Sequence, residues 1–287
     1  MPALLILLST ATHLGESIFI KRYNTRHSQG GFVFTALISF FSMLFFLVTD
    51  QNGFLLPADL WWYGLASGVL YCSASFATYL AFQFGSYAMT MLILSYSIVF
   101  SIGYGLIFLK ESATIFTYAG LALVLASLYL LRAAKKEEKE KTKFSFKWLI
   151  CITVAAIGNG MFSVVQRMQQ LRFDNTVNNE FMVMALTFST LTLLTVGVWR
   201  NRKDFSYVLR HGLLWTAGAG VSNGMTNSMV VFLHTLMPIS ISSPIRVAVK
   251  VVASFLLSVF LYRERFEKRQ IVGAMLGMLA LILLNIK

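Results

Sequence analysis

Ten long apolar runs, separated by short polar segments, dominate this chain of 287 residues. Each run exceeds the roughly 10 to 14 residues of an apolar soluble core helix and approaches the roughly 20 residues that cross a bilayer. We therefore predict an all-α integral membrane protein with ten transmembrane helices. The runs are Leu4–Ile20, Phe32–Val48, Leu60–Ala81, Ala88–Leu109, Ile115–Leu131, Trp148–Val165, Phe181–Val198, Gly212–Phe232, Ile239–Tyr262 and Ile271–Ile286.

The ninth run carries a polar stripe. Its members recur at spacings of three or four, which places them on one face of a helix. They are Ser243, Arg246, Lys250, Ser254 and Ser258. An Arg or Lys at the centre of a spanning helix costs roughly 2.5 to 3.5 kcal/mol without a compensating environment, so the stripe predicts a lined cavity or pathway.

Three other runs also place polar residues on one face, at spacings of three or four in the first and sixth runs and of four and seven in the eighth. In the sixth and eighth runs the alternatives are hydrogen bonds between helices and contacts with a ligand. The residues are Ser9, His13 and Glu16 in the first run, Asn159, Ser163 and Gln166 in the sixth, and Asn223, Asn227 and His234 in the eighth. Among the aromatic residues, most of which are expected to pack, Tyr96 adjoins the stripe and is the best candidate for a wall of the cavity.

Glu16 leaves three interpretations open. It exchanges protons, it pairs with Arg246 or Lys250, or it lies near enough to the membrane interface to be hydrated. A metal site at His13 and Glu16 is not expected, because two ligands do not complete a coordination shell.

Composition and charge support a membrane protein. Hydrophobic residues make up 57% of the chain and charged residues 13%, and the mean hydropathy is +0.69. The net charge of +12 does not indicate a nucleic-acid partner, because 18 of the 24 Lys and Arg residues lie in segments that follow odd-numbered runs. By the positive-inside rule these segments are cytoplasmic and both termini are outside.

The two halves of the chain repeat at an offset of 153 residues. Lys110, Glu111 and Gly120 correspond to Arg263, Glu264 and Gly273. At the same offset Thr90, Ser97 and Ser101 correspond to Ser243, Lys250 and Ser254, so the fourth run carries a neutral version of the stripe. Five spans per half invert the second half relative to the first, as in alternating-access carriers. We predict repeats at 1–133 and 147–287, joined by a charged linker at 134–146.

These features resemble the EamA-like branch of the drug/metabolite transporter superfamily. The resemblance is carried by the five-plus-five helices, by Glu111 and Glu264, and by Gly120 and Gly273. It implies that the third, fourth, eighth and ninth helices surround a cavity, that the first and sixth are movable walls, and that the fifth and tenth give support. Glu16 also resembles the Glu with which the small multidrug resistance relatives exchange protons for cationic drugs.

Together these observations predict a secondary or exchange transporter of a small polar metabolite with an anionic or zwitterionic group. The alternatives are a proton-coupled exporter of organic cations that uses Glu16, and a flippase of lipids or lipid-linked sugars. The chain carries no hydrolytic motif and no Walker loop, so we expect neither an enzyme nor a cofactor.

We expect the protein to lie in the cell membrane, of the bacterial inner-membrane type, as a monomer or weak dimer, with protons as candidate coupling ions. The candidate substrate-binding residues are Arg246, Lys250, Glu16, His13, Asn159, Asn223, Asn227, Tyr96, Ser97 and Ser243.

Overall fold

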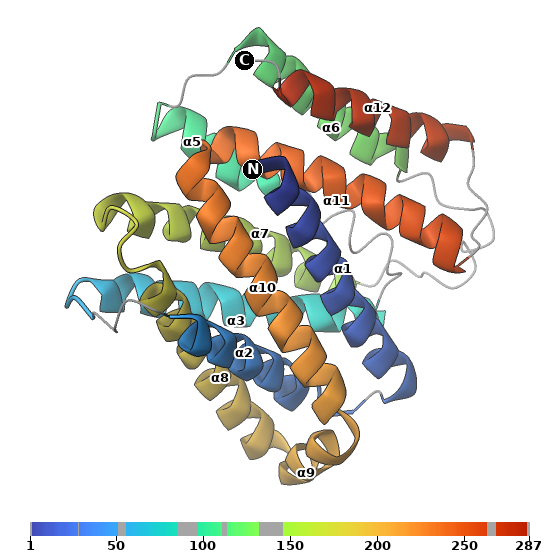
Figure 1. Cartoon of the computed structure of the whole chain (residues 1–287). Helices are drawn as coiled ribbons and strands as arrows, with labels where there is room; N and C mark the ends of the chain where they lie inside the picture. Colours follow the sequence, from blue (N-terminus) through green and yellow to red (C-terminus); the bar gives the residue numbers. More distant parts are fainter. Residues whose placement is uncertain are drawn as a thin grey trace.

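The computed structural model is built from helices throughout the part of the chain that it describes, residues 2–27, 29–50, 56–84, 94, 97–110, 114–131, 146–262 and 268–285 (Figure 1). The helices are α1 (Pro2–Arg26), α2 (Gly31–Thr49), α3 (Leu60–Phe84), α5 (Ile98–Ile107), α6 (Ile115–Leu131), α7 (Phe146–Arg172), α8 (Asn178–Arg200), α9 (Arg202–His211), α10 (Leu213–Leu236), α11 (Ile239–Tyr262) and α12 (Lys268–Asn285). The prediction of an all-helical fold is confirmed for these residues.

Five helices, α1, α2, α3, α7 and α8, contain segments long and apolar enough to cross a membrane. Their outer faces carry exposed apolar side chains such as Leu7, Val48 and Trp62, which suit a lipid environment better than water. Of the predicted fourth span, Ala88–Leu109, only the part around α5 is described. Most of the linker 134–146 lies outside the described residues.

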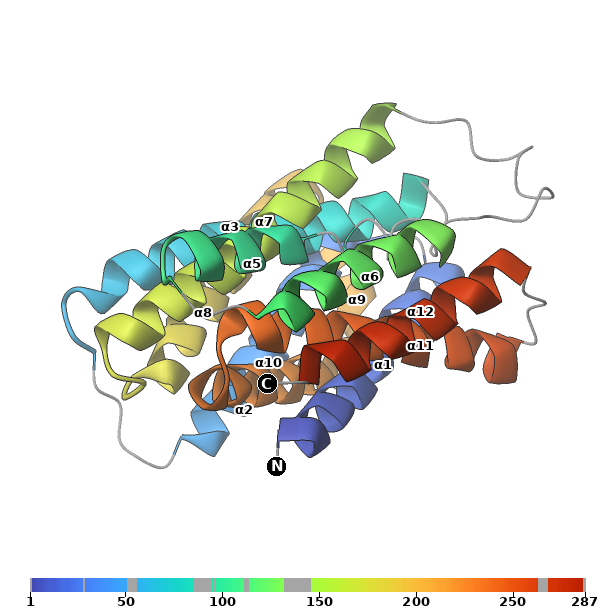
Figure 2. The ribbon, with the colours of Figure 1, turned by 90° about the horizontal axis from the view of Figure 1, so that it is seen from above.

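The helices pack in pairs that join the two halves of the sequence. The main pairs are α1 with α10, α3 with α7, and α2 with α8, and further contacts join α2 to α10 and α3 to α8. Figures 1 and 2 show α6 and α12 side by side at one edge of the bundle, where they contact α11. The largest buried cluster includes Phe46, Leu60, Phe162, Phe181 and Leu186, and it lies where α2, α3, α7 and α8 meet.

Glycine residues permit the close approach of α10 and α2. A Cβ atom built on Gly220 would lie 2.5 Å from Cβ of Phe41 and 2.7 Å from the carbonyl oxygen of Ile38. A Cβ atom on Gly224 would lie 2.8 Å from Cβ of Phe45. The Gly-x-x-x-Gly spacing therefore packs two helices of the same chain together, as such motifs do in membranes.

The helix α9 is not one of the predicted spans. It follows α8 directly, and its first turn is capped by Asn201, whose side-chain oxygen accepts a hydrogen bond from the backbone N–H of Lys203 at 3.2 Å. Val208 is fully buried, whereas Phe205 and Leu209 remain exposed beside basic residues. The segment is thus an amphipathic helix at one end of the bundle (Figure 1).

We expect Gly220→Ala to lower the free energy of unfolding by about 1 to 3 kcal/mol, because the added methyl group meets backbone as well as side-chain atoms. Gly103→Ala is the matched control, since a Cβ atom there meets nothing within 4 Å among the described residues. Thermal unfolding in detergent measures the stability of both variants. Equal melting temperatures for the two variants would contradict this account of the α2–α10 contact.

Candidate functional site

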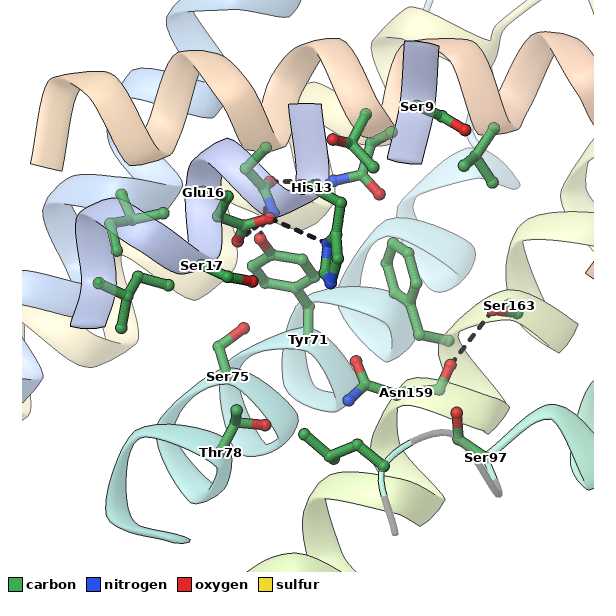
Figure 3. A pocket seen from close by; sticks show the side chains of 18 of the residues that line it. Ser9, His13, Glu16, Ser17, Tyr71, Ser75, Thr78, Ser97, Asn159 and Ser163 are labelled. Carbon is green, nitrogen blue, oxygen red and sulfur yellow. Dashed lines mark hydrogen bonds and ion pairs between the residues drawn. The ribbon is translucent and has the colours of Figure 1, made fainter. Parts of the chain in front are cut away.

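A cavity of about 310 Å³ lies between α1, α2, α3, α7, α10 and α11, with residues 94 and 97 also at its wall. Figure 3 shows the side chains that α1, α3 and α7 contribute. The predicted site residues that line it are Glu16, His13, Ser97, Asn159, Asn223, Asn227, Arg246 and Lys250. The structure thus brings together residues that lie far apart in the sequence.

Two predicted site residues are not seen at this cavity. Ser243 is buried, with 3% of its surface exposed, but it is not among the lining residues. The stripe on α11 therefore extends beyond this cavity toward the start of the helix, and a binding role for Ser243 stays a prediction. Tyr96 lies outside the described residues.

The helix α1 presents His13 and Glu16 together to the cavity (Figure 3). Nδ1 of His13 lies 3.4 Å from Oε2 of Glu16, and the two side chains are 27% and 13% exposed. Their spacing of three residues places them on one face of the helix. One turn earlier, the hydroxyl of Ser9 also lies at the cavity but donates to the carbonyl of Ile6 at 2.9 Å.

Asn223 is the centre of a hydrogen-bond network that joins four helices. Its side-chain oxygen accepts hydrogen bonds from the hydroxyl groups of Ser42 and Tyr71, each at 2.9 Å. The same oxygen accepts a hydrogen bond from Nδ2 of Asn227 at 2.9 Å. Nδ2 of Asn223 donates in turn to Oε1 of Glu16 at 3.0 Å. The network therefore fixes the carboxylate of α1 relative to α2, α3 and α10.

This network bears on the three interpretations of Glu16. Within the described residues its partners are Asn223 and His13, and no ion pair joins it to Arg246 or Lys250. The ion pair with Arg246 or Lys250, one of the three interpretations, is therefore not formed among the described residues. The described residues also contain no group of three or more His, Cys, Asp or Glu side chains that would hold a metal ion.

Arg246 and Lys250 both line the cavity from α11. Neither forms a hydrogen bond or an ion pair with another described residue, and Nε of Arg246 is buried without a partner there. A buried cation without a counter-charge is strongly unfavourable. Water or an anionic ligand in the cavity would relieve this cost, and two parallel N–H groups of an arginine match a carboxylate or a phosphate.

The remaining predicted polar residues divide between the cavity and the packing. Ser163 and Gln166 line the cavity beside Asn159, and the Ser163 hydroxyl donates to the carbonyl of Asn159 at 3.2 Å. His234 is not among the lining residues and is 1% exposed. The side chains of Ser254 and Ser258 are outside the described part of the chain.

Several lining residues were not predicted. Thr35 and Ser39 of α2 belong to the cavity wall, as do Ser75 and Thr78 of α3. Tyr71 was expected to serve in packing, yet its hydroxyl donates to Asn223. The signal in the sequence was the spacing of three or four, which Thr35 and Ser39 share with Tyr71, Ser75 and Thr78. This signal is weak because Ser and Thr in helices often bond to their own backbone. Thr35 does so here, to the carbonyl of Gly31 at 2.8 Å.

The structure thus combines helices long and apolar enough to cross a membrane with a cavity lined by polar and charged side chains. The sequence profile of the EamA-like transporter family matches residues 1–133 and 146–286, so the chain belongs to this family. It is therefore a multi-pass membrane protein of the drug/metabolite transporter superfamily, a superfamily of transporters.

Solved structures share the fold at low sequence identity. One crystal structure is 16% identical, with a TM-score of 0.67 over 99% of this chain and 94% of the other. In all, 28 chains of solved structures match. No curated protein sequence matches the chain.

We expect Asn223→Ala to destabilise the protein by about 1 to 3 kcal/mol, because three donors lose their acceptor and Glu16 loses a donor. Ser163→Ala is the control, since that cavity residue bonds only within its own helix. Unfolding in mixed detergent micelles gives the free energy of unfolding of both variants. If Asn223→Ala unfolded like the control, the network would not hold the four helices together.

Proposed function

We propose that the protein is a secondary or exchange transporter of a small polar metabolite that bears an anionic or zwitterionic group. The observation that carries this proposal is the state of the charges in the cavity. Arg246 and Lys250 face it without a described ion-pair partner, whereas Glu16 is held by Asn223 and His13. A carboxylate or phosphate of the substrate would supply the missing counter-charge.

The proposal includes ten spans arranged as two inverted five-helix repeats. Its support is that the helix contacts themselves are paired across the two halves. If α1, α2, α3, α5 and α6 correspond in order to α7, α8, α10, α11 and α12, then the contact of α1 with α10 has its counterpart in that of α7 with α3. Likewise the contact of α2 with α10 corresponds to that of α8 with α3. The two separate matches to the family profile support the division into halves.

Alternating access follows from this arrangement. In carriers built from inverted repeats, one repeat rocks against the other around a site near the middle of the membrane. The proposed moving walls are α1, which contacts α10 and α11, and α7, which contacts α3 and α5. Among the described side chains, α6 and α12 contribute none to the cavity lining, and this pair would serve as support, as the family resemblance implies.

A second candidate function rests on the contact between His13 and Glu16. Both side chains line the cavity, and they lie 3.4 Å apart, which is close enough for the imidazole to respond to the charge of the carboxylate. A proton-coupled exporter of organic cations would use this pair to exchange a proton for its substrate. The two positive side chains on α11 weigh against it, because they would repel a cation in the same cavity.

The proposed location is the cell membrane, with both termini outside. The basic residues of the segment between α8 and α10 would then face the cytoplasm, and the segment between α7 and α8 would face outward.

Lys250→Gln is expected to lower uptake into proteoliposomes at least about tenfold, because the anionic group loses a charge-assisted hydrogen bond. The assay uses a panel of labelled carboxylates, phosphates, zwitterions and organic cations. Lys147→Gln is the control, since Lys147 is exposed at the start of α7. Transport of organic cations alone would replace the proposal by the multidrug alternative.

The double variant Glu16→Gln with Lys250→Gln separates ligand binding from charge neutralisation. If Lys250 binds substrate, the single variant stays folded and the double variant stays inactive. Recovery of both melting temperature and uptake in the double variant would mean that the lysine serves Glu16 instead.

The orientation is tested by thiol labelling after Cys72 and Cys151 are replaced by alanine. In intact cells we expect an impermeant maleimide to label Thr176→Cys, which lies between α7 and α8, and to leave Lys203→Cys on α9 unlabelled. Both positions are exposed in the structure. The reverse pattern would invert the topology and leave the transport proposal intact.

A further inference from the structure

Beyond the cavity, three basic side chains from three helices lie near one another: Arg167 of α7, His234 of α10 and Arg246 of α11. Nη1 of Arg167 donates to the carbonyl oxygen of His234 at 2.8 Å. Arg246 lies on the neighbouring helix α11, which contacts α10, and it lines the cavity together with Val230 of α10. We call these three residues the basic cluster.

The basic cluster continues directly from the cavity along each of its helices. Val230, one turn before His234 on α10, lines the cavity, and so does Gln166, which precedes Arg167 on α7. Arg246 belongs both to the basic cluster and to the cavity lining. The cluster therefore lies at the end of the cavity where α10 ends and α11 begins.

Several polar atoms of the basic cluster are buried and lack a hydrogen-bond partner among the described residues. His234 is 1% exposed, and within the described part of the chain neither of its ring nitrogens has a hydrogen-bond partner. The same holds for Nε of Arg167 and Nε of Arg246. Buried polar atoms in proteins almost always have a partner, so several unpaired ones on neighbouring helices are suited to hydrogen bonds with a ligand.

Two serine hydroxyls add to this set. Ser242 and Ser243 precede Arg246 by four and three residues on α11, so they share its face of the helix. Both are buried, at 0% and 3% exposed, and their hydroxyl groups have no partner among the described residues. Ser243 belongs to the predicted stripe, whereas Ser242 was not predicted.

The charge of the basic cluster selects the kind of ligand. No ion pair joins Arg167 or Arg246 to a carboxylate of the described residues. Arg172, five residues further along α7, is different, because it is exposed and pairs with Asp59 at 3.3 Å. Guanidinium groups only donate hydrogen bonds, so their missing partner must accept them. An oxyanion meets this need with several acceptor atoms and a negative charge.

We infer that Arg167, His234 and Arg246, with the hydroxyls of Ser242 and Ser243, form a second anion subsite for a carboxylate or phosphate group. This inference rests on the proposed function. It adds that an anionic group held by Lys250 moves one helical turn to Arg246 and then to Arg167 as it leaves or enters the cavity. The source of the group is either the substrate itself or free inorganic phosphate.

Inorganic phosphate alone is the first probe, because it presents this chemistry without a known substrate. Its affinity is measured from the rise in melting temperature of the full chain in detergent. We expect Arg167→Gln to weaken phosphate binding at least about tenfold, the loss expected for one charge-assisted hydrogen bond. Arg172→Gln, the matched control on the same helix, is expected to bind phosphate like the unaltered protein.

Equal phosphate affinity in Arg167→Gln and Arg172→Gln would overturn the subsite. Arg167→Lys is the conservative variant that separates loss of binding from misfolding, since it keeps the charge but cannot donate two parallel hydrogen bonds. We expect it to bind phosphate more weakly than Arg172→Gln does, and unchanged affinity in this variant would equally contradict the inference.

Competition distinguishes the two sources of the anion. If phosphate inhibits uptake of an anionic compound from the panel, and Arg167→Gln relieves the inhibition, the subsite receives the substrate's own group. If phosphate stabilises the protein without inhibiting uptake, the subsite holds a free anion.

Loss of uptake in Lys250→Gln with normal phosphate binding in Arg167→Gln would reject the subsite but keep the proposed function. Transport of cations alone, together with phosphate binding that depends on Arg167, would reject the proposed function but keep the subsite.

Discussion

Two positive charges within a membrane protein need a counter-charge or water, and the rest of this structure depends on how that need is met. Arg246 and Lys250 project into a cavity of about 310 Å³ instead of packing against apolar side chains. The obvious internal partner, Glu16, is engaged by Asn223 and His13. Positive charge is thus left available to a ligand, and the transport proposal follows from this imbalance.

The packing keeps this arrangement in place. Hydrogen bonds from Ser42, Tyr71 and Asn227 converge on one oxygen of Asn223, which ties α2, α3 and α10 to the carboxylate of α1. Close contact at Gly220 brings α10 against α2, so these bonds are short. If α1 moves as a wall of the cavity, it must either break these hydrogen bonds or move together with the helices that form them. The hydrogen bond of Asn223 to Glu16 is therefore a place where substrate binding and helix movement would be coupled.

Helical periodicity predicted much of the cavity lining. Polar residues spaced by three or four in an apolar run share one face of a helix, and that face is unfavourable against lipid. This reasoning located the cavity faces of α1, α7, α10 and α11. It could not reveal which residue pairs with Glu16, since that depends on distances between helices that no local pattern encodes. It missed Thr35 and Ser39, because a hydroxyl group in a helix often bonds to its own backbone and so gives little sign of a cavity. A periodic stripe also does not show where a cavity ends, so the role of Ser243, which is not among the lining residues, stays a prediction. It also did not foresee α9, whose ten residues are too few and too polar to register as a span.

The most direct test is an experimental structure of the protein with a heavy oxyanion such as selenate, located by its anomalous scattering. The account predicts a selenate ion within hydrogen-bond distance of Lys250 or Arg246, with Glu16 still bonded to Asn223. A carboxylate of Glu16 bridging to Lys250, in a cavity that contains no anion at saturating selenate, would contradict the claim that these cations are held for a ligand.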